Sequence, residues 1–247
     1  MKKIIVALVA SVAALAFFMG CKTVPVGIAD RGPVLVLSVT GNHSLPWKED
    51  SNPNSDVDKD GDGDGLLSNL VGSLISKNNV ERLSGPDRLD YAVDSFHRLL
   101  EETGGVEVVP AETLFASQSY DNTRENIFNV LEAKISANGY KNLMKIGSKR
   151  ARMIMEETGA KSLIIAEFKF QKTNISGNKW TGKVAAAVTM KIRYLDERGK
   201  EIVNSEFEAT SVESLPIASR KYDKEALVDL FPDTIDAVIN QFILKNL

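Results

Sequence analysis

The chain has 247 residues, of which 43% are hydrophobic and 26% charged, a composition typical of one or two globular domains rather than of a disordered chain. A single cysteine excludes an intramolecular disulfide, and only two histidines exclude most histidine-rich zinc sites. Thirty basic against thirty-three acidic residues give a formal net charge of −3, so the chain offers no overall electrostatic attraction for nucleic acid.

The first 21 residues are typical of a bacterial export signal. Lys2 and Lys3 precede an apolar run over residues 4–19, which leads to the small residue Gly20 and then to Cys21. This run is shorter than the roughly 20 residues that a membrane-spanning helix needs, and no second apolar run of that kind follows it. We therefore expect the chain to be exported and not to span a bilayer.

The chain's only cysteine stands where the hydrophobic region ends. Residues 18–21, Phe-Met-Gly-Cys, resemble the lipobox of bacterial lipoproteins, with Phe18 in place of the common leucine, as in the looser lipobox of spirochaetes. The resemblance implies that residues 1–20 are removed, that Cys21 receives a diacylglycerol and further acyl chains such as palmitate, and that residues 21–32 form a tether. Several acyl chains would hold the protein firmly at a membrane, because each buried methylene contributes about 0.8 kcal/mol.

The residue after the cysteine bears on which membrane is used. Lys22 stands where an aspartate favours retention in the inner membrane by the enterobacterial sorting rule, so the resemblance favours the outer membrane. The alternative is an ordinary secretory signal in which Cys21 is incidental. A lone exposed thiol in an oxidising envelope argues against that alternative.

One short segment holds the excess negative charge of the mature chain. Without Lys2 and Lys3, 28 of the 30 basic residues remain against 33 acidic ones, a charge of −5. Residues 48–64 include seven acidic and two basic side chains and so account for all of it. Their Ser, Asn, Pro, Asp and Gly composition is unsuitable for a packed strand or helix, so we expect an inserted loop at about 43–65.

Carboxylates alternate along this loop, at Asp56, Asp58, Asp60, Asp62 and Asp64. Hard oxygen ligands at this spacing suit calcium, and with the interleaved glycines the segment resembles the calcium loops of EF-hands, dockerins and thrombospondin-type repeats. It departs from the EF-hand at the twelfth position, where Leu67 replaces a bidentate glutamate. Two interpretations stay open, a weak calcium site and a solvated acidic linker. A phosphate site is excluded, because the aspartates would repel an anion.

The first half of the body alternates strands and helices. Residues 33–40 are β-branched and apolar and predict a buried strand, and residues 106–110 predict a second. Helical spacing of apolar residues predicts helices over 87–104, 124–136 and 146–158, the last closed by a glycine.

The second half is richer in strands. Residues 162–170 predict a buried strand, and strict alternation over 184–194 predicts a half-buried one that turns back through 202–209. If Leu195 pairs with Ile202 in this hairpin, then Lys191 faces Glu206 and Met190 faces Phe207, which matches charge with charge and apolar with apolar. A helical stripe from about Leu227 to Ile243, with Pro232 in the first turn, ends the chain and is interpreted as core.

The order strand, helix, strand, two helices, three strands, helix predicts one α/β domain over 33–247, a single mixed sheet of about five strands with helices packed on it. Residues 151–166 and the hairpin at Gly199 resemble the periplasmic α/β domain of the TolB N-terminal region, CsgG-type secretion lipoproteins and the lipoprotein activators of penicillin-binding proteins. That resemblance implies protein–protein contacts. Apart from the calcium that the acidic loop could bind, we expect no cofactor.

Catalytic patterns are absent from the sequence. It contains no nucleophile elbow, P-loop, dinucleotide fingerprint or zinc-protease motif, and Cys21 would be blocked by lipid. His97 lies within an amphipathic helix, and the pairs Glu101–Glu102 and Glu156–Glu157 are interpreted as solvated. We expect no enzyme but a lipid-anchored module that binds or assembles unidentified envelope proteins. The alternatives are a surface-exposed, calcium-dependent ligand-binding lipoprotein and, third, an envelope hydrolase.

Overall fold

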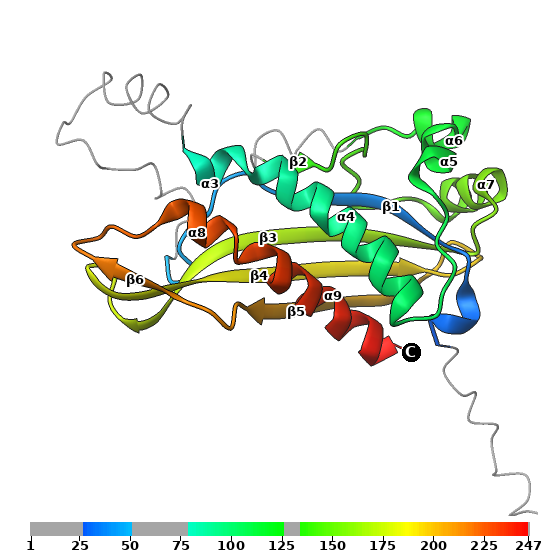
Figure 1. Cartoon of the computed structure of the whole chain (residues 1–247). Helices are drawn as coiled ribbons and strands as arrows, with labels where there is room; N and C mark the ends of the chain where they lie inside the picture. The colour runs from blue at the N-terminus through cyan, green and yellow to red at the C-terminus, as the bar shows by residue number, and fades with distance from the viewer. Residues whose placement is uncertain (1–26, 51–78, 126–133, 247) are drawn as a thin grey trace, which may run out of the picture.

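The computed structural model describes residues 27–50, 79–125 and 134–246. The predicted signal, Cys21 and the five alternating aspartates of the acidic loop lie outside these ranges. The described residues form one mixed sheet in the order β2-β1-β3-β4-β5, with β6 paired to β4 (Figure 1). Its strands are β1 (Val34–Asn42), β2 (Lys134–Ser136), β3 (Ser162–Gly177), β4 (Thr181–Leu195), β5 (Glu201–Thr210) and β6 (Leu215–Ala218). This agrees with the predicted α/β class and single sheet.

The sheet is mixed because β1 and β3 run parallel while its other pairs are antiparallel. Two long helices, α4 and α9, cross one face side by side (Figure 1). The small elements η1, α5, α6 and α7 lie at the end of the sheet nearest the C-terminus, whereas α3 and α8 lie at the other end beside β6. The bounds are η1 (Ala29–Arg31), α3 (Val80–Leu83), α4 (Gly85–Glu102), α5 (Ala111–Phe115), α6 (Gln118–Asp121), α7 (Ser148–Thr158), α8 (Lys224–Val228) and α9 (Phe231–Asn246).

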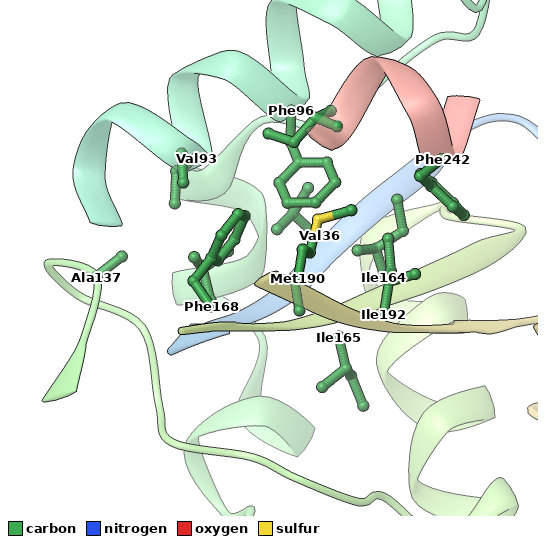
Figure 2. Close-up of a cluster of buried hydrophobic side chains, with 14 of the residues drawn as sticks. Val36, Val93, Phe96, Ala137, Ile164, Ile165, Phe168, Met190, Ile192 and Phe242 are labelled. Carbon is green, nitrogen blue, oxygen red and sulfur yellow. The ribbon is translucent and has the colours of Figure 1, made fainter. Parts of the chain in front are cut away.

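The hydrophobic core lies between the sheet and these two helices. Phe96 of α4 packs edge to face on Phe168 of β3, with ring centroids 6.1 Å apart, and Met190 and Phe242 fill the space beside them (Figure 2). Alternate strand residues point to opposite faces, so Ile165 lies on the other side of the sheet from Phe168 (Figure 2). Along the middle of β4, the residues on the side of α4 and α9 are buried, whereas Thr189, Lys191 and Arg193 on the other side are half-buried or exposed, which explains the strict alternation in the sequence.

The hairpin of β4 and β5 has the register expected for its centre. Lys191 lies opposite Glu206, and Met190 lies opposite Phe207. Both pairs were predicted from the matching of opposite charges and of apolar side chains across the strands, and both are confirmed.

The end of the same hairpin was predicted wrongly. Leu195 lies opposite Glu201 and not opposite Ile202, because the register shifts directly after Tyr194, which faces Val203. The shift is a bulge in the pairing of β4 with β5, and Ile202 is 39% exposed on this edge strand.

Two predicted elements near the middle of the chain are corrected. Residues 106–110 form no strand but a single parallel bridge between Val108 and Val34, because Pro110 lacks an N–H and is the N-cap of α5. The helix predicted over 124–136 is contradicted at its end, since β2 occupies residues 134–136 and pairs with β1; residues 126–133 lie outside the described ranges. Pairing with the sheet edge overrides the local helical pattern there.

Helix ends follow the sequence signals closely. The helix predicted from residue 146 begins at Ser148, after Gly147, and ends as expected at Gly159, whose φ of +76° is the left-handed conformation that favours glycine. The predicted helix over 87–104 is α4, and Pro232 is the second residue of α9. The last helical stripe is core, as predicted.

The arm formed by β3 and β4 is longer than predicted. The two strands continue to a turn at 178–180, and β6, which was not predicted, pairs with the extension of β4. The hydrophobic pattern of the sequence does not show this extension, because its residues are largely polar and its end, Ile175, Ser176 and Gly177, is exposed. The arm projects at the end of the sheet opposite the C-terminus (Figure 1).

Candidate functional site

The residues proposed from the sequence for lipidation and calcium binding lie outside the described ranges, so their geometry is not part of the site described below. Within the described residues, no group of three or more His, Cys, Asp or Glu side chains could hold a metal ion. No helix in those ranges is long and apolar enough to cross a membrane.

The two histidines are separately engaged. His43 Nδ1 accepts a hydrogen bond from Arg82 Nε at 3.0 Å, and burial together with Arg82 and Arg88 lowers the pKa of His43. His97 is half-buried on α4, as expected from its helical position, and burial lowers its pKa in spite of nearby acidic groups. Both imidazoles therefore favour the neutral form near pH 7.

The face of the sheet opposite α4 and α9 carries charged side chains in register. Glu167 of β3, Lys191 of β4 and Glu206 of β5 lie side by side across three strands, and Thr189 and Glu208 form the next row. Lys191, Glu206 and Glu208 are exposed, and Glu167 is half-buried. We call this surface of β3, β4 and β5 the open face.

A shallow depression of ≈ 370 Å³ lies on the open face. Its charged lining is balanced, three lysines against three glutamates, and the rest is polar: Lys48, Glu167, Lys169, Gln171, Thr189, Lys191, Glu206 and Glu208. A smaller hollow beside it continues to Thr40, Met144, Ile165 and Arg193. The surface thus has a pattern of charge without a net charge.

Ion pairs hold several of these groups in place. Lys134 Nζ lies 2.9 Å from Glu167 Oε1, and Lys48 forms an ion pair with Glu208. Arg193 donates from Nη1 to the Met144 carbonyl at 2.9 Å. A general acid needs an apolar surrounding that raises its pKa, so this open, paired arrangement suits recognition better than proton transfer.

A second polar group lies at the other end of the sheet and is buried. Lys172 Nζ lies 3.3 Å from Glu81 Oε2, and the Tyr222 hydroxyl donates to Glu81 Oε1 at 2.6 Å. The Lys172 ammonium also lies over the rings of Trp47 and Tyr222, at 5.4 and 5.6 Å from their centroids. The group joins β3 to α3 and to the segment before α8.

Arg88 lies next to this pair. The residue is 3% exposed, and its guanidinium donates to the carbonyls of Glu81 at 2.9 Å and His43 at 3.2 Å and lies over the rings of Phe170 and Phe231. Burial lowers the pKa of Arg88 to about 10, against the opposing effect of Glu81. The sequence does not indicate this buried group, because a lysine after an apolar strand and an arginine in an amphipathic helix are both typical of surface residues.

The glutamate pairs predicted to be solvated divide into two cases. Glu101 and Glu102 are exposed, as predicted. Glu157 is exposed but engaged: its carboxylate accepts hydrogen bonds from the Ser117 hydroxyl at 2.6 Å and from Ser119 N–H at 2.9 Å. These bonds fasten α6 to α7 and lower the pKa of Glu157 to about 2.

Comparisons with known proteins give no family for the chain. No protein-family model matches the sequence, and no curated protein matches it. Among solved structures, the LpoB C-terminal domain from Salmonella enterica is 11% identical over 71% of this chain and 79% of that one, with a TM-score of 0.29.

Two further solved structures are similar to a comparable degree. The LpoB C-terminal domain from Escherichia coli is 14% identical over 79% of this chain and 92% of that one, with a TM-score of 0.25. Lipoprotein GNA1162 from Neisseria meningitidis is 17% identical over 85% of this chain and 96% of that one, with a TM-score of 0.27. At such scores these likenesses carry no argument about function, and the resemblance to periplasmic domains stays a prediction.

Proposed function

We propose that the chain is a lipid-anchored protein of a bacterial cell envelope that works by binding another protein through its open face. The lipobox-like residues that end at Cys21 support the proposed anchor. The binding role rests on one observation, the balanced pattern of lysines and glutamates that lines the depression on β3, β4 and β5.

The charge pattern indicates the class of partner. A nucleic acid or an anionic membrane selects a surface with net positive charge, which the three lysines and three glutamates of the depression do not supply. Interleaved charges of both signs instead distinguish one protein surface from another, because a partner with the wrong pattern meets like charges. The proposed partner is therefore an envelope protein with a complementary mixed-charge surface.

Site-specific photo-crosslinking of the full-length protein in intact cells tests this proposal. A photoreactive residue at Thr189, in the depression, should capture one partner that is not captured from Glu102, which is exposed on α4 on the opposite face. Removing two charges with Lys169→Gln and Lys191→Gln should abolish that capture while the melting temperature stays within a few degrees. Capture from both positions alike, or capture that survives the loss of the two charges, would contradict the proposal.

A further inference from the structure

The tip of the β3–β4 arm is strongly basic. Residues 175–183 contain Lys179 and Lys183 and no acidic residue, and residues 216–221 contain Arg220 and Lys221 and no acidic residue. The two segments are neighbours, because β6 pairs with β4 between Thr181 and Ala218. We call residues 175–183 with 216–221 the hairpin tip.

Large apolar side chains are exposed on the same tip. Trp180 is 56% exposed and Ile175 is 51% exposed. The Trp180 backbone is fixed, since its N–H donates to Asn178 Oδ1 at 2.8 Å and its carbonyl accepts from Arg220 N–H at 3.0 Å. An indole that the fold holds in place and leaves exposed is a typical anchor of a binding surface.

Arg220 lies over this indole. Its guanidinium carbon is 4.9 Å from the Trp180 ring centroid, and the side chain is otherwise exposed. A guanidinium that lies on an aromatic face still has the N–H groups at its edge available, and these can bind a carboxylate with two hydrogen bonds. The pair thus presents an apolar indole and, beside it, guanidinium N–H groups that can bind an anion.

The backbone that places Arg220 is strained. Ser219 and Arg220 have φ values of 51° and 64°, and Ala218 and Lys221 exchange two backbone hydrogen bonds of 2.9 Å around them. This is the two-residue hairpin turn with both central residues left-handed, for which Asn-Gly is preferred. The chain keeps a side chain where glycine would relieve the strain, and the result is the position of Arg220 over Trp180.

Part of the positive charge of the tip is not neutralised locally. Lys179 forms an ion pair with Asp50, whereas Lys183, Arg220 and Lys221 have no ion pair within the described ranges. We propose that the hairpin tip binds an acidic segment of a protein, with Arg220 holding a carboxylate and Trp180 packing on the adjoining side chain. None of these residues lines the open face, so the tip is a second surface. Binding at the tip can therefore be tested independently of binding at the open face.

A protein is favoured over a membrane by two observations. A membrane patch needs basic and aromatic residues but no fixed pairing, whereas here a strained turn fixes one arginine on one indole. The described chain also begins at the opposite end of the sheet, where Ile28 N–H donates to the Asn246 carbonyl, so the tip points away from the end that follows Cys21 (Figure 1).

The test uses purified full-length protein and fluorescently labelled poly-L-glutamate at low ionic strength. We expect binding that salt weakens, and a loss of affinity of about fivefold to tenfold on Trp180→Ser or Arg220→Gln. The matched control is Lys149→Gln, which removes an exposed positive charge from α7 at the other end of the molecule and should leave the affinity unchanged.

Arg220→Gly separates a binding role from a structural one. Because glycine suits the left-handed turn, this variant should melt at a higher temperature than the natural protein and still bind poly-L-glutamate more weakly. A lower melting temperature would show that Arg220 is structural and would overturn the proposal. In the Cys21→Ala variant, which lacks the proposed acyl chains, binding to phosphatidylglycerol vesicles without binding to poly-L-glutamate would overturn the proposal in favour of a membrane, and binding to neither would overturn it outright.

Discussion

Lys172 and Glu81 form a buried ion pair in which Nζ lies 3.3 Å from Oε2, with the two side chains only 8% and 5% exposed. The pair connects the middle of β3 to α3, the first described element after residues 51–78. Two charges removed from water remain paired only where hydrogen bonds and aromatic rings complete their surroundings, and here Tyr222 and Trp47 do so.

We expect Lys172→Met to lower the free energy of unfolding by about 3–5 kcal/mol, because it leaves the Glu81 carboxylate buried without its cation. The double variant with Glu81→Gln should recover part of this loss. Urea unfolding followed by circular dichroism measures both. Lys179→Met is the matched control: Lys179 also lies over Trp47 and pairs with Asp50, but its side chain is 39% exposed, so its loss should cost below about 1 kcal/mol. Equal losses for the two lysines would contradict the assignment of a buried, mutually dependent pair.

The sequence predicted the fold best where periodicity and burial coincide. Apolar spacing located α4 and α9, and alternation with charge matching set Lys191 opposite Glu206. It failed where tertiary contacts decide the local structure. Residues 134–136 form β2 only because the edge of β1 is available, and a bulge that no pattern signals shifts the hairpin after Tyr194.

The candidate surfaces were harder to predict for a related reason. The rows of the open face follow from the predicted register, since Lys191 and Glu206 were placed opposite each other. The hairpin tip does not, because nothing in the residues around Trp180 shows that β6 will bring Arg220 onto its ring. The burial of Lys172 could not be predicted either, since a single charged residue at the end of an apolar strand is usually solvated.

Glu157 should make stability depend on pH in the acid range. Hydrogen bonds from Ser117 and Ser119 lower its folded-state pKa to about 2 from an ordinary value of 4.5, so the unfolded chain binds more protons between these values. Its contribution is complete above about pH 4.5 and is lost as the pH falls through 2. We expect Glu157→Gln to lower the melting temperature at pH 7, and the difference from the natural protein to shrink progressively between pH 4.5 and 2.

Glu156→Gln provides the control for this experiment. It removes the same charge from the adjacent residue of α7, whose side chain is exposed and makes no hydrogen bond within the described ranges. The melting temperatures of this variant and the natural protein should run in parallel from pH 7 to pH 2. A Glu157→Gln curve that did the same would show that the hydrogen bonds to α6 do not stabilise the fold.

Cys21→Ala should separate the protein from the membrane. If the thiol carries acyl chains, the variant incorporates no radiolabelled palmitate and moves from the membrane fraction to the soluble fraction after cell lysis. The folded domain should be unaffected, so the Cys21→Ala variant should melt at the same temperature as the natural protein. Palmitate incorporation that is unchanged in Cys21→Ala, or equal retention on washed membranes, would remove the proposed anchor.

The alternating aspartates give the last prediction, which concerns calcium. Five carboxylates at alternate positions repel one another, so a cation that binds them should give a measurable heat of binding and raise the melting temperature, with a dissociation constant of about 10⁻⁴–10⁻³ M if the site is of the extracellular kind. Isothermal titration of the full-length protein with calcium chloride, repeated with Asp58→Asn and Asp60→Asn together, measures this. The paired control replaces Glu197 and Asp196 at the β4–β5 turn by their amides, which removes as much charge elsewhere. Calcium binding that the control retains and the loop variant loses would establish the site. The absence of heat and of any thermal shift in the natural protein would leave the segment as a solvated acidic linker.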